Sequence, residues 1–461
     1  MQTIDHELPP SWRRLKVGDV CKLEGGFAFK SKEYKTEGIP VVRISNVKAG
    51  GLDWRSKVYW SEQLEPELQR YLLRRGDVLI SMTGNIGETC QVRESDLPAL
   101  LNQRVGRFAI NGSELISSEF LLFASKTDEF RGRVSGNAYG AVQQNVSGKG
   151  IEAVEFSVPP LPEQQKIAAV LGVVQRAIEQ QERLLQLSAE LKKTLLHQLF
   201  TQGLRGEPQK KTEIGPVPES WELVPLGSLA KIGNGSTPKR DNEAYWQEGT
   251  IPWLNSAKIH ERFITEADQF VTELAVNECH LPRVKPGSLL IAITGQGKTL
   301  GNSALVSFET CINQHLAYAL FTSSNVVPEF VLWFMETRYE HLRSVSQAGG
   351  STKGALTCRY LKTYPVPVPS LDEQREVAHV FAALDRKEKV HERKHATLTE
   401  IFRTLLHRLM TAQIRVNSLD LLELGLDKER TIQQSSCPAK GRAKAGLLER
   451  QTPTEEGFIL S

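Results

Sequence analysis

The chain has 461 residues, a hydrophobic fraction of 40% and a formal net charge of +3. This length is typical of roughly three domains with ordinary cores, and a charge this small neither indicates nor excludes nucleic-acid binding. The six cysteines form no Cys-x-x-Cys pair, so neither a zinc site nor a disulfide framework is indicated. No run approaches about 18 apolar residues, and the N-terminus lacks an apolar signal core, so we expect a cytoplasmic protein.

The first globular segment is predicted to be rich in strands. Residues 41–44 and 78–82 are mostly aliphatic and β-branched, and glycine pairs interrupt the pattern as turns do. Ser118 is expected to cap a short helix. We assign residues 1–158 to a first domain of mixed α and β structure.

A long helix is predicted over residues 159–202. It follows the adjacent Pro159 and Pro160, and proline resists helical continuation on its N-terminal side. Spacings of three and four place the apolar residues on one stripe. They are Ile167, Leu171, Val174, Ile178, Leu185, Leu191, Leu195 and Leu199. At roughly 1.5 Å per residue, this helix is a rod about 60 Å long.

The rest of the chain divides in the same way. Residues 203–219 contain three prolines and three glycines and are predicted to be an exposed linker. A second strand-rich domain is expected over residues 220–368, and a second long helix over residues 369–413. The tail, residues 414–461, is polar and expected to be largely disordered, after one short helix around residues 419–424.

The second long helix differs from the first in its middle. Its apolar stripe consists of Val377, Phe381, Leu384, Leu398, Ile401, Leu405 and Leu409. Residues 386–395, between these groups, are mostly charged. Three interpretations remain open for this segment: a solvated face, a weakened seam between helices, or a surface for another subunit.

The two halves of the chain repeat each other at an offset of about 210 residues. Matching positions keep their order: Trp12 with Trp221, residues 38–40 with 249–252, residues 76–80 with 287–291, Thr83-Gly84 with Thr294-Gly295, Asn102-Gln103 with Asn313-Gln314, and Glu163-Gln164 with Glu373-Gln374. The residues between these matches differ widely. The pattern indicates a duplicated framework whose loops have acquired separate specificities, because binding residues concentrate in loops. Duplication for stability alone is the alternative.

The repeat also predicts how the helices pack. An apolar stripe is not stable in water, so the two helices are expected to pack on each other, antiparallel if the molecule is pseudo-twofold. We therefore predict an α+β fold, with two similar strand-rich domains separated by two long helices packed as an antiparallel coiled coil. Domains at opposite ends of such a rod suit DNA sites about one helical turn (~34 Å) apart.

One segment imitates a nucleotide-binding loop. Residues 292–299 follow a predicted strand and carry Lys298 and Thr299 in the expected places. We reject a nucleotide site, because Ala292 stands where that loop needs glycine and poor helix formers follow. A strand-to-strand turn carrying a lysine suits contact with a DNA phosphate better.

Catalytic motifs are missing from the sequence. It contains no Asn-Pro-Pro-aromatic or Asp-Pro-Pro-aromatic stretch for methyl transfer to an amino group, no Gly-x-Ser-x-Gly elbow and no His-Glu-x-x-His pair. We therefore predict no catalytic residues, no metal ligands and no cofactor in this chain.

Candidates for DNA contact are Arg, Lys, Asn and Gln side chains on predicted loops, because these types bond phosphates and base edges. In the first domain they are Lys30, Lys32, Arg43, Asn46, Lys48, Gln143, Gln144 and Lys149. In the second domain they are Lys239, Arg240, Lys258, Lys298 and Lys353. For each of them a solvated surface charge is the alternative. The pair Asn102-Gln103 recurs as Asn313-Gln314, and we interpret this shared pair as structural.

Several phrases in duplicated order carry a resemblance to a known family. They are the two Ser-Trp dipeptides ending at Trp12 and Trp221, residues 25–30, residues 233–238, residues 287–291, and the two Pro-x-Leu-x-Glu-Gln openings at residues 159–164 and 369–374. Through them the sequence resembles the specificity (S) subunits of type I restriction-modification systems, from Leu8 to about Gln413. The tail beyond Ile414 departs from the pattern.

The resemblance implies a non-catalytic subunit that acts in DNA methylation and in defence against foreign DNA. Two target-recognition domains would each recognise one half of a split, asymmetric double-stranded DNA sequence. The helices would act as a spacer and dock two modification subunits, which bind S-adenosylmethionine and methylate adenine. Restriction subunits, driven by ATP with magnesium, would complete the assembly.

Two alternatives come from other functional classes. The chain is a self-contained enzyme that modifies DNA if the purified protein alone transfers methyl groups, although the motifs for this are missing. It is a helical scaffold for proteins if it shows no sequence-dependent DNA affinity once modification subunits are added. The strand-rich domains with basic loops favour DNA recognition over both.

Overall fold

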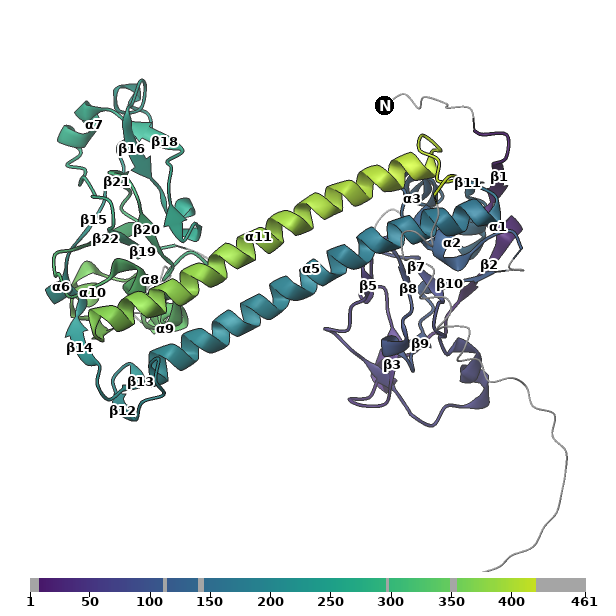
Figure 1. The fold of residues 1–461 in the computed structure, drawn as a ribbon, viewed down its shortest axis with the longest axis horizontal. Coiled ribbons are helices and arrows are strands. Elements are labelled where there is room, and N and C mark those ends of the chain that lie inside the picture. The colour runs from purple at the N-terminus through teal and green to yellow at the C-terminus, as the bar shows by residue number, and fades with distance from the viewer. Residues whose placement is uncertain (1–7, 111–113, 140–144, 296–297, 349–354, 420–461) are drawn as a thin grey trace, which may run out of the picture. The chain divides into compact units, whose positions relative to one another are not determined.

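The computed structural model describes residues 8–110, 114–139, 145–295, 298–348 and 355–419, which form two compact units (Figure 1). Unit 1 comprises Met1–Ala177 and Leu398–Ser461, and unit 2 comprises Ile178–Thr397. Each long helix belongs partly to one unit and partly to the other. Residues 420–461, which include most of the predicted tail and of its predicted short helix, lie outside the described residues.

An antiparallel sheet of four strands, in the order β2-β10-β7-β8, forms the centre of unit 1. Its strands are β2 (Cys21–Gly25), β7 (Val78–Ser81), β8 (Thr89–Gln91) and β10 (Val105–Ile110). Smaller sheets join β1 (Arg13–Lys16) to β11 (Glu155–Val158), β4 (Val47–Lys48) to β5 (Gly51–Leu52), and β3 (Ile39–Val42) to both β6 (Tyr59–Trp60) and β9 (Leu100–Leu101). The short α-helices are α1 (Val17–Val20), α2 (Ser118–Ala124), α3 (Asp128–Gly136) and α4 (Gly148–Glu152), and the 3-10 helices are Ser31–Glu33, Pro66–Tyr71 and Glu94–Asp96.

Unit 2 repeats this arrangement with a sheet in the order β15-β22-β19-β20-β17. Its strands are β15 (Ala230–Asn234), β17 (Phe263–Ile264), β19 (Leu289–Ala292), β20 (Ser303–Val306) and β22 (Leu316–Phe321). Smaller sheets join β12 (Gln209–Thr212) to β13 (Gly215–Pro218), β14 (Glu222–Pro225) to β23 (Pro365–Val368), and β16 (Ile251–Leu254) to both β18 (Gln269–Val271) and β21 (Cys311–Ile312). The short α-helices are α6 (Leu226–Leu229), α7 (Glu273–Glu278), α8 (Pro328–Thr337), α9 (Tyr339–Ala348) and α10 (Cys358–Thr363), and the 3-10 helices are Glu243–Tyr245 and Ser256–His260.

The two units share one topology. The order β2-β10-β7-β8 corresponds to β15-β22-β19-β20, and the pair β1-β11 corresponds to β14-β23. The pairing of β3 with β9 is parallel, as is that of β16 with β21. The repeat in the sequence is therefore a repeat of the fold, and the predicted fold class is confirmed.

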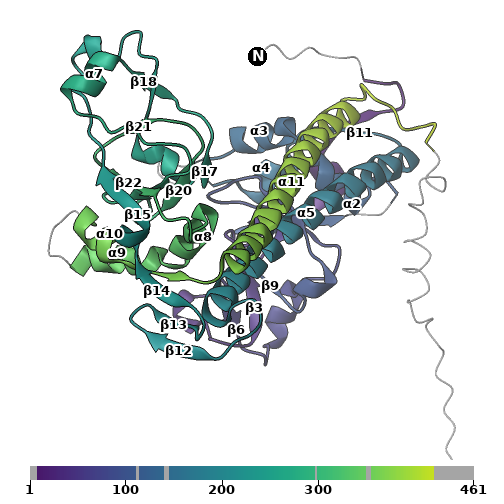
Figure 2. The same ribbon diagram turned by 60° about the vertical axis from the view of Figure 1, so that its left-hand side comes forward.

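The long helices are α5 (Leu161–Gln202) and α11 (Leu371–Met410), which lie side by side and antiparallel in both views (Figures 1 and 2). Lys192 Nζ lies 2.6 Å from Asp385 Oδ1 and Gln181 Oε1 lies 2.8 Å from His391 Nδ1, so residue numbers rise on one helix as they fall on the other. Most residues of the two apolar stripes are buried or half-buried, whereas Leu191 and Ile401 are 49% and 43% exposed. The first helix begins directly after Pro160, where the proline pair predicts that it should.

A tryptophan and a glutamate join each strand-rich domain to its long helix. Trp12 Nε1 donates to Glu163 Oε2 at 3.1 Å in unit 1, and Trp221 Nε1 donates to Glu373 Oε2 at 3.2 Å in unit 2. All four residues belong to the repeated phrases of the sequence. The Ser-Trp and Glu-Gln phrases recur because they form the same junction twice.

The glutamine that follows each glutamate is completely buried. Gln164 Oε1 accepts a hydrogen bond from Ser117 N, and its Nε2 donates to the carbonyls of Leu115 and Pro159. Gln374 makes the equivalent three bonds in unit 2, to Val327 N and to the carbonyls of Asn325 and Pro369. Each glutamine thus satisfies backbone groups that would otherwise be buried without partners.

Two local predictions differ from the structure. Helix α2 is capped by Ser117, whose hydroxyl accepts from Phe120 N at 3.1 Å, and the predicted cap Ser118 is the first helical residue. The segment predicted as an exposed linker contains the hairpin β12-β13. Ile214 and Val217 are two apolar side chains within an otherwise polar stretch. Both are buried in the core of unit 2.

Among the described residues, no helix combines the length and the apolar character needed to cross a bilayer.

Candidate nucleic-acid interface

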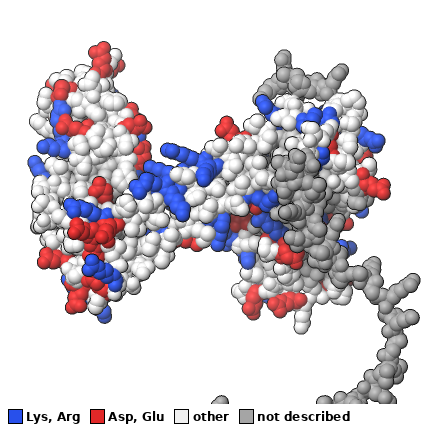
Figure 3. Space-filling view, in the orientation of Figure 1, with Lys and Arg blue, Asp and Glu red and all other residues white. Residues whose placement is uncertain are grey.

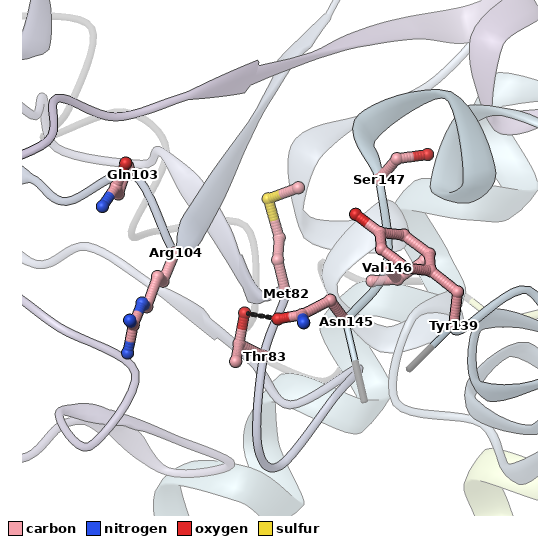
Figure 4. A pocket seen from close by; sticks show the side chains of 8 residues that line it. All are labelled: Met82, Thr83, Gln103, Arg104, Tyr139, Asn145, Val146 and Ser147. Atoms are coloured by element: carbon pink, nitrogen blue, oxygen red, sulfur yellow. Dashed lines mark hydrogen bonds between the residues drawn. The ribbon is translucent and has the colours of Figure 1, made fainter. Parts of the chain in front are cut away.

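An open pocket of about 330 Å³ lies in unit 1 where three loops meet (Figure 4). These loops follow β7, precede β10 and precede α4. Backbone hydrogen bonds join them, since Met82 N donates to Arg104 O at 3.0 Å and Val146 N donates to Met82 O at 2.9 Å. Thr83 Oγ1 also donates to Asn145 Oδ1 at 2.7 Å. The loops are therefore anchored to two strands of the central sheet.

The pocket presents polar side chains that have no partner within the described part of the protein. Gln103 and Arg104 are exposed, and neither side chain bonds to another described residue. Tyr139 is 61% exposed. Guanidinium and carboxamide groups bond the edges of bases, and a tyrosine hydroxyl bonds phosphates. The chemistry of this pocket fits a nucleic acid.

The recurring Asn-Gln pair combines one structural residue with one exposed residue. Asn102 is 7% exposed, and its Oδ1 accepts from Arg104 N at 3.2 Å. Asn313 is 4% exposed, and its Oδ1 accepts from His315 N at 3.1 Å. The structural interpretation therefore holds for the asparagines. The glutamine after each asparagine is exposed. Gln103 has no side-chain partner among the described residues, whereas Gln314 Oε1 accepts a hydrogen bond from Thr237 Oγ1.

Unit 2 builds the equivalent loops on the same backbone frame. Leu356 N donates to Ile293 O at 2.8 Å, which matches the bond between the corresponding loops of unit 1. Thr294 Oγ1 lies 2.5 Å from His315 Nδ1, and His315 is exposed where unit 1 has Arg104. The two units thus present different side chains on one frame. Residues 349–354, between α9 and the strand-like contact at Ala355, lie outside the described residues.

All four predicted lysines of unit 1 are exposed: Lys30, Lys32, Lys48 and Lys149. Within the described part of the chain, Lys30 is the one of these with an ion pair, at 3.5 Å from Glu33, and both side chains are well exposed. Such a pair is weak and leaves the lysine free to exchange its partner. The predicted Gln143 and Gln144 lie outside the described residues.

Arg43 and Asn46 act within the protein. Asn46 is 1% exposed, and its side-chain amide accepts from Arg43 N and donates to the carbonyls of Asp53 and Ser56. The structure therefore does not support DNA contact by Asn46, which instead holds its loop together. The Arg43 guanidinium donates to the carbonyl and hydroxyl of Ser56 at 3.2 and 3.0 Å.

Arg240 is held in a fixed orientation at the surface of unit 2. Its guanidinium lies 3.8 Å from the ring centre of Trp246 and 4.9 Å from that of Trp253, and it donates to Gln269 Oε1 at 2.8 Å. The residue is nevertheless exposed, as is its neighbour Lys239. Aromatic stacking fixes the plane of the guanidinium, which is the group that most often bonds guanine in the major groove.

The other predicted lysines of unit 2 differ in their availability. Lys258 lies 2.8 Å from Glu261 and 3.2 Å from Asp268, and its side chain is 11% exposed. The hydrogen bond to Glu261 raises its pKa. Lys258 is therefore neutralised by two carboxylates, and the structure does not support its predicted contact with DNA. The Lys298 side chain is exposed without a partner among the described residues, whereas Lys353 lies outside them.

The segment that imitates a nucleotide-binding loop connects two strands. It joins β19 to β20, which pair antiparallel from Leu289 with Leu305 to Ile291 with Ser303. A phosphate-binding loop of the nucleotide type must instead lead into the N-terminus of a helix.

The family of the protein follows from a comparison with known proteins. The model of the type I restriction modification DNA specificity domain matches residues 9–189 and again residues 218–400. The two matches cover most of the chain and coincide with its two repeats. The chain belongs to this family and carries two copies of its domain. It is a specificity subunit, the class of type I subunit that is not itself catalytic.

Relatives that are named as specificity subunits match over most of their length. The chain is 24% identical to the putative type I restriction enzyme MjaX specificity subunit of Methanocaldococcus jannaschii, over 89% of this chain and 96% of that protein. It is 23% identical to the type I restriction enzyme EcoBI specificity subunit of Escherichia coli, over 89% of each. The S subunit of a type I restriction-modification system from M. genitalium shares the fold, with a TM-score of 0.59 at 17% identity over 89% of this chain and 98% of that one.

Proposed function

We propose that each unit of this subunit recognises one half of a bipartite, asymmetric double-stranded DNA target. The observation that carries this proposal is the pair of equivalent loops with different exposed side chains. After a shared exposed glutamine, Gln103 or Gln314, unit 1 presents Arg104 and unit 2 presents His315. One frame with two sets of polar groups suits two different base sequences, because bases are distinguished by hydrogen bonds to their edges.

Other exposed groups supply affinity and further base contacts. Lys30, Lys32, Lys48 and Lys149 in unit 1, with Lys239 and Lys298 in unit 2, are proposed to contact phosphates, which positions a protein on DNA without specifying sequence. Arg240 is proposed to bond a base, because its orientation is already fixed before DNA binds. A side chain ordered in advance loses less entropy on binding.

The long helices are proposed to dock two modification subunits. On α5, Leu184, Leu187 and Leu191 are 40%, 42% and 49% exposed, and their spacing of three and four places them on one face. An exposed apolar stripe of this kind suits a protein partner. The modification subunits would bind S-adenosylmethionine and methylate adenine, and restriction subunits using ATP and magnesium would join them. We place this assembly in the cytoplasm.

The test is methylome sequencing of a host that expresses this chain with its modification subunit. We expect methylated adenine in a bipartite motif that disappears when this chain is deleted. Exchanging residues 11–158 for those of another specificity subunit should change one half of the motif and leave the other. No new motif, with a modification subunit shown to be active with a different specificity subunit, would contradict DNA recognition and favour a scaffold.

A separate assay addresses the enzymatic alternative. The purified chain alone should not transfer labelled methyl groups from S-adenosylmethionine to DNA. Transfer that persists after the removal of any modification subunit would show that the chain is an enzyme.

A further inference from the structure

The middle of α11 carries a stripe of unpaired positive charge. Arg386, Lys387, Lys389, Arg393 and Lys394 are all exposed, and none has an ion pair or hydrogen bond from its side chain to the described residues. Figure 3 shows that Lys and Arg side chains gather over this part of the helix. We call these five residues the α11 basic stripe. At about 1.5 Å per residue, it extends about 12 Å along the helix.

Contacts on the opposite side of α11 fix which way the stripe faces. Asp385 lies 2.6 Å from Lys192 of α5 and 2.9 Å from Arg262. His391 lies 2.8 Å from Gln181 of α5. These contacts hold one face of α11 against the rest of unit 2. The stripe residues lie on the remaining faces, so their charges point to solvent.

The stripe belongs to one of the two repeats. Residues 386–395 contain five Lys or Arg and two Glu, a net charge of 5 − 2 = +3. The matching residues of α5, 176–185, contain two Arg and two Glu, a net charge of 2 − 2 = 0. Both helices perform the same packing and junction roles, so packing does not require the additional charge. A partner that one repeat meets and the other does not is the simpler explanation.

The composition of the stripe indicates the class of that partner. Val390, 47% exposed, is the one large apolar side chain that the described residues expose between its cations. The cores of protein interfaces are depleted in lysine and rich in apolar and aromatic groups, as the leucine face of α5 is apolar. Interfaces with DNA are more positive and more polar. The stripe therefore matches a nucleic-acid surface better than a protein surface.

We propose that the α11 basic stripe binds the phosphate backbone of the target DNA, outside the loops that recognise bases. The proposal rests on the proposed function, since it assigns a second contact to the same DNA. Double-stranded DNA presents one charge per roughly 1.7 Å of its axis, so about seven phosphates lie within the length of the stripe. Contacts of this kind add affinity that does not depend on sequence.

The experiment compares two triple variants that each remove three positive charges. The stripe variant is K387Q/K389Q/K394Q, and the control is K211Q/K231Q/K285Q, whose three lysines are exposed elsewhere in unit 2. Each is assembled with its modification subunits, and affinity for a duplex carrying the methylated motif and for one lacking it is measured over a range of salt concentration. Thermal unfolding and sedimentation confirm folding and assembly.

We expect the stripe variant to bind both duplexes more weakly by the same factor. The slope of log affinity against log salt should fall by about 3, since each phosphate contact contributes roughly 0.9. The control should keep the slope of the unmodified protein, and the methylated motif should be the same for all three. An unchanged slope in the stripe variant would overturn the proposal, and so would dissociation of the modification subunits, which would identify the stripe as a protein-docking surface.

The same data separate this proposal from the proposed function. An unmodified complex that binds both duplexes equally, and methylates no motif, contradicts DNA recognition as a whole. If the wild-type complex discriminates between the duplexes, but the stripe variant has the same salt slope as the wild type, only the proposed role of the α11 basic stripe is contradicted.

Discussion

Units 1 and 2 are alike where side chains bond the backbone and differ where side chains meet solvent. Gln164 and Gln374 each make the same three buried bonds. Arg104 and His315 occupy the same exposed turn with different chemistry. The comparison teaches that the duplicated residues maintain the fold, whereas the diverged residues are the ones to examine for specificity.

The junction glutamates show a subtler difference between the units. Glu163, 5% exposed, is bonded by the guanidinium of Arg415 at 2.6 and 3.0 Å. Glu373 instead accepts from the backbone of Leu204 at 3.2 Å, and Arg205, which matches Arg415 in the repeat, is exposed. The same carboxylate is thus satisfied by a charge in unit 1 and by a backbone amide in unit 2.

The largest effects are expected from the buried glutamines. Replacing Gln164 or Gln374 with Ala leaves three buried backbone groups without partners, and each such group costs about 1–3 kcal/mol. We expect Q164A to destabilise unit 1, and Q374A to destabilise unit 2, by about 3 kcal/mol or more. The exposed Gln180 gives a matched control, since Q180A should change stability by less than about 0.5 kcal/mol.

Buried cysteines report the stability of each unit separately. Burial raises the pKa of Cys21 and Cys90 in unit 1 to about 12, and that of Cys311 in unit 2 to about 11. These thiols should therefore react with a thiol reagent only on unfolding. In a background with the other cysteines replaced by serine, Q164A should expose the unit 1 thiols at lower urea, and Q374A the unit 2 thiol. Simultaneous labelling of both units in either variant would show that the units do not unfold independently.

The next effect tests the junction that differs between the units. R415A leaves the buried Glu163 carboxylate without its cation, and we expect unit 1 to lose about 2 kcal/mol of stability. R205A, at the matching position of unit 2, should have no measurable effect. Equal destabilisation by both substitutions, measured by urea denaturation, would show that the two junctions do not differ as described.

Substitutions in the exposed turns of unit 1 and unit 2 should each alter a different half of the methylated motif. Q103A/R104A is expected to relax recognition at one half of the methylated motif, because each missing bond to a base reduces discrimination by about 1–3 kcal/mol. H315A should affect only the other half. Methylome sequencing of the two variants measures this directly, and a change in both halves from either variant would contradict the assignment of one half to each unit.

A smaller change is expected at Arg240. R240K keeps the positive charge but removes the planar group that stacks on Trp246 and bonds Gln269. We expect discrimination at one base pair to fall about tenfold, with general DNA affinity nearly unchanged. K239Q, next to it, should weaken binding to all duplexes equally. A uniform decrease from R240K would place Arg240 on a phosphate.

The smallest effect compares two lysines of unit 2. K298Q removes an exposed charge, and the slope of log affinity against log salt should fall by about 1. K258Q removes a charge already neutralised by Glu261 and Asp268, so this slope should not change. A larger effect from K258Q would mean that DNA displaces these carboxylates.

The sequence predicts the framework well because its signals are local or repeated. Adjacent prolines mark the start of α5, and the apolar spacing indicates that both helices bury one stripe. The burial of Asn46 and the pairing of Lys258 with two carboxylates were not predictable, because the loop conformation decides which nearby residues meet. Ile214 shows the same limit, because two apolar residues in a polar segment do not reveal that a hairpin packs on a core.

The candidate site was predicted in part. Exposed lysines were found from their type and their place on loops, but Arg104 was not singled out, and Gln103 was interpreted as structural although it is exposed. The signal for Gln103 was present, because it recurs beside Asn102, but recurrence does not tell which member of a pair faces solvent. Gln103 lies in the turn before β10, where no strand alternation predicts which side chain faces solvent.

The sharing of α11 between the units has a consequence for synthesis of the protein. Leu406, Leu409 and Val416 belong to the hydrophobic core of unit 1, together with residues from the first 171 of the chain. The ribosome produces them only after the whole of Ile178–Thr397. Unit 1 is therefore the first to emerge from the ribosome and the last to be completed. Part of its apolar core stays uncovered until Leu406, Leu409 and Val416 have been synthesised.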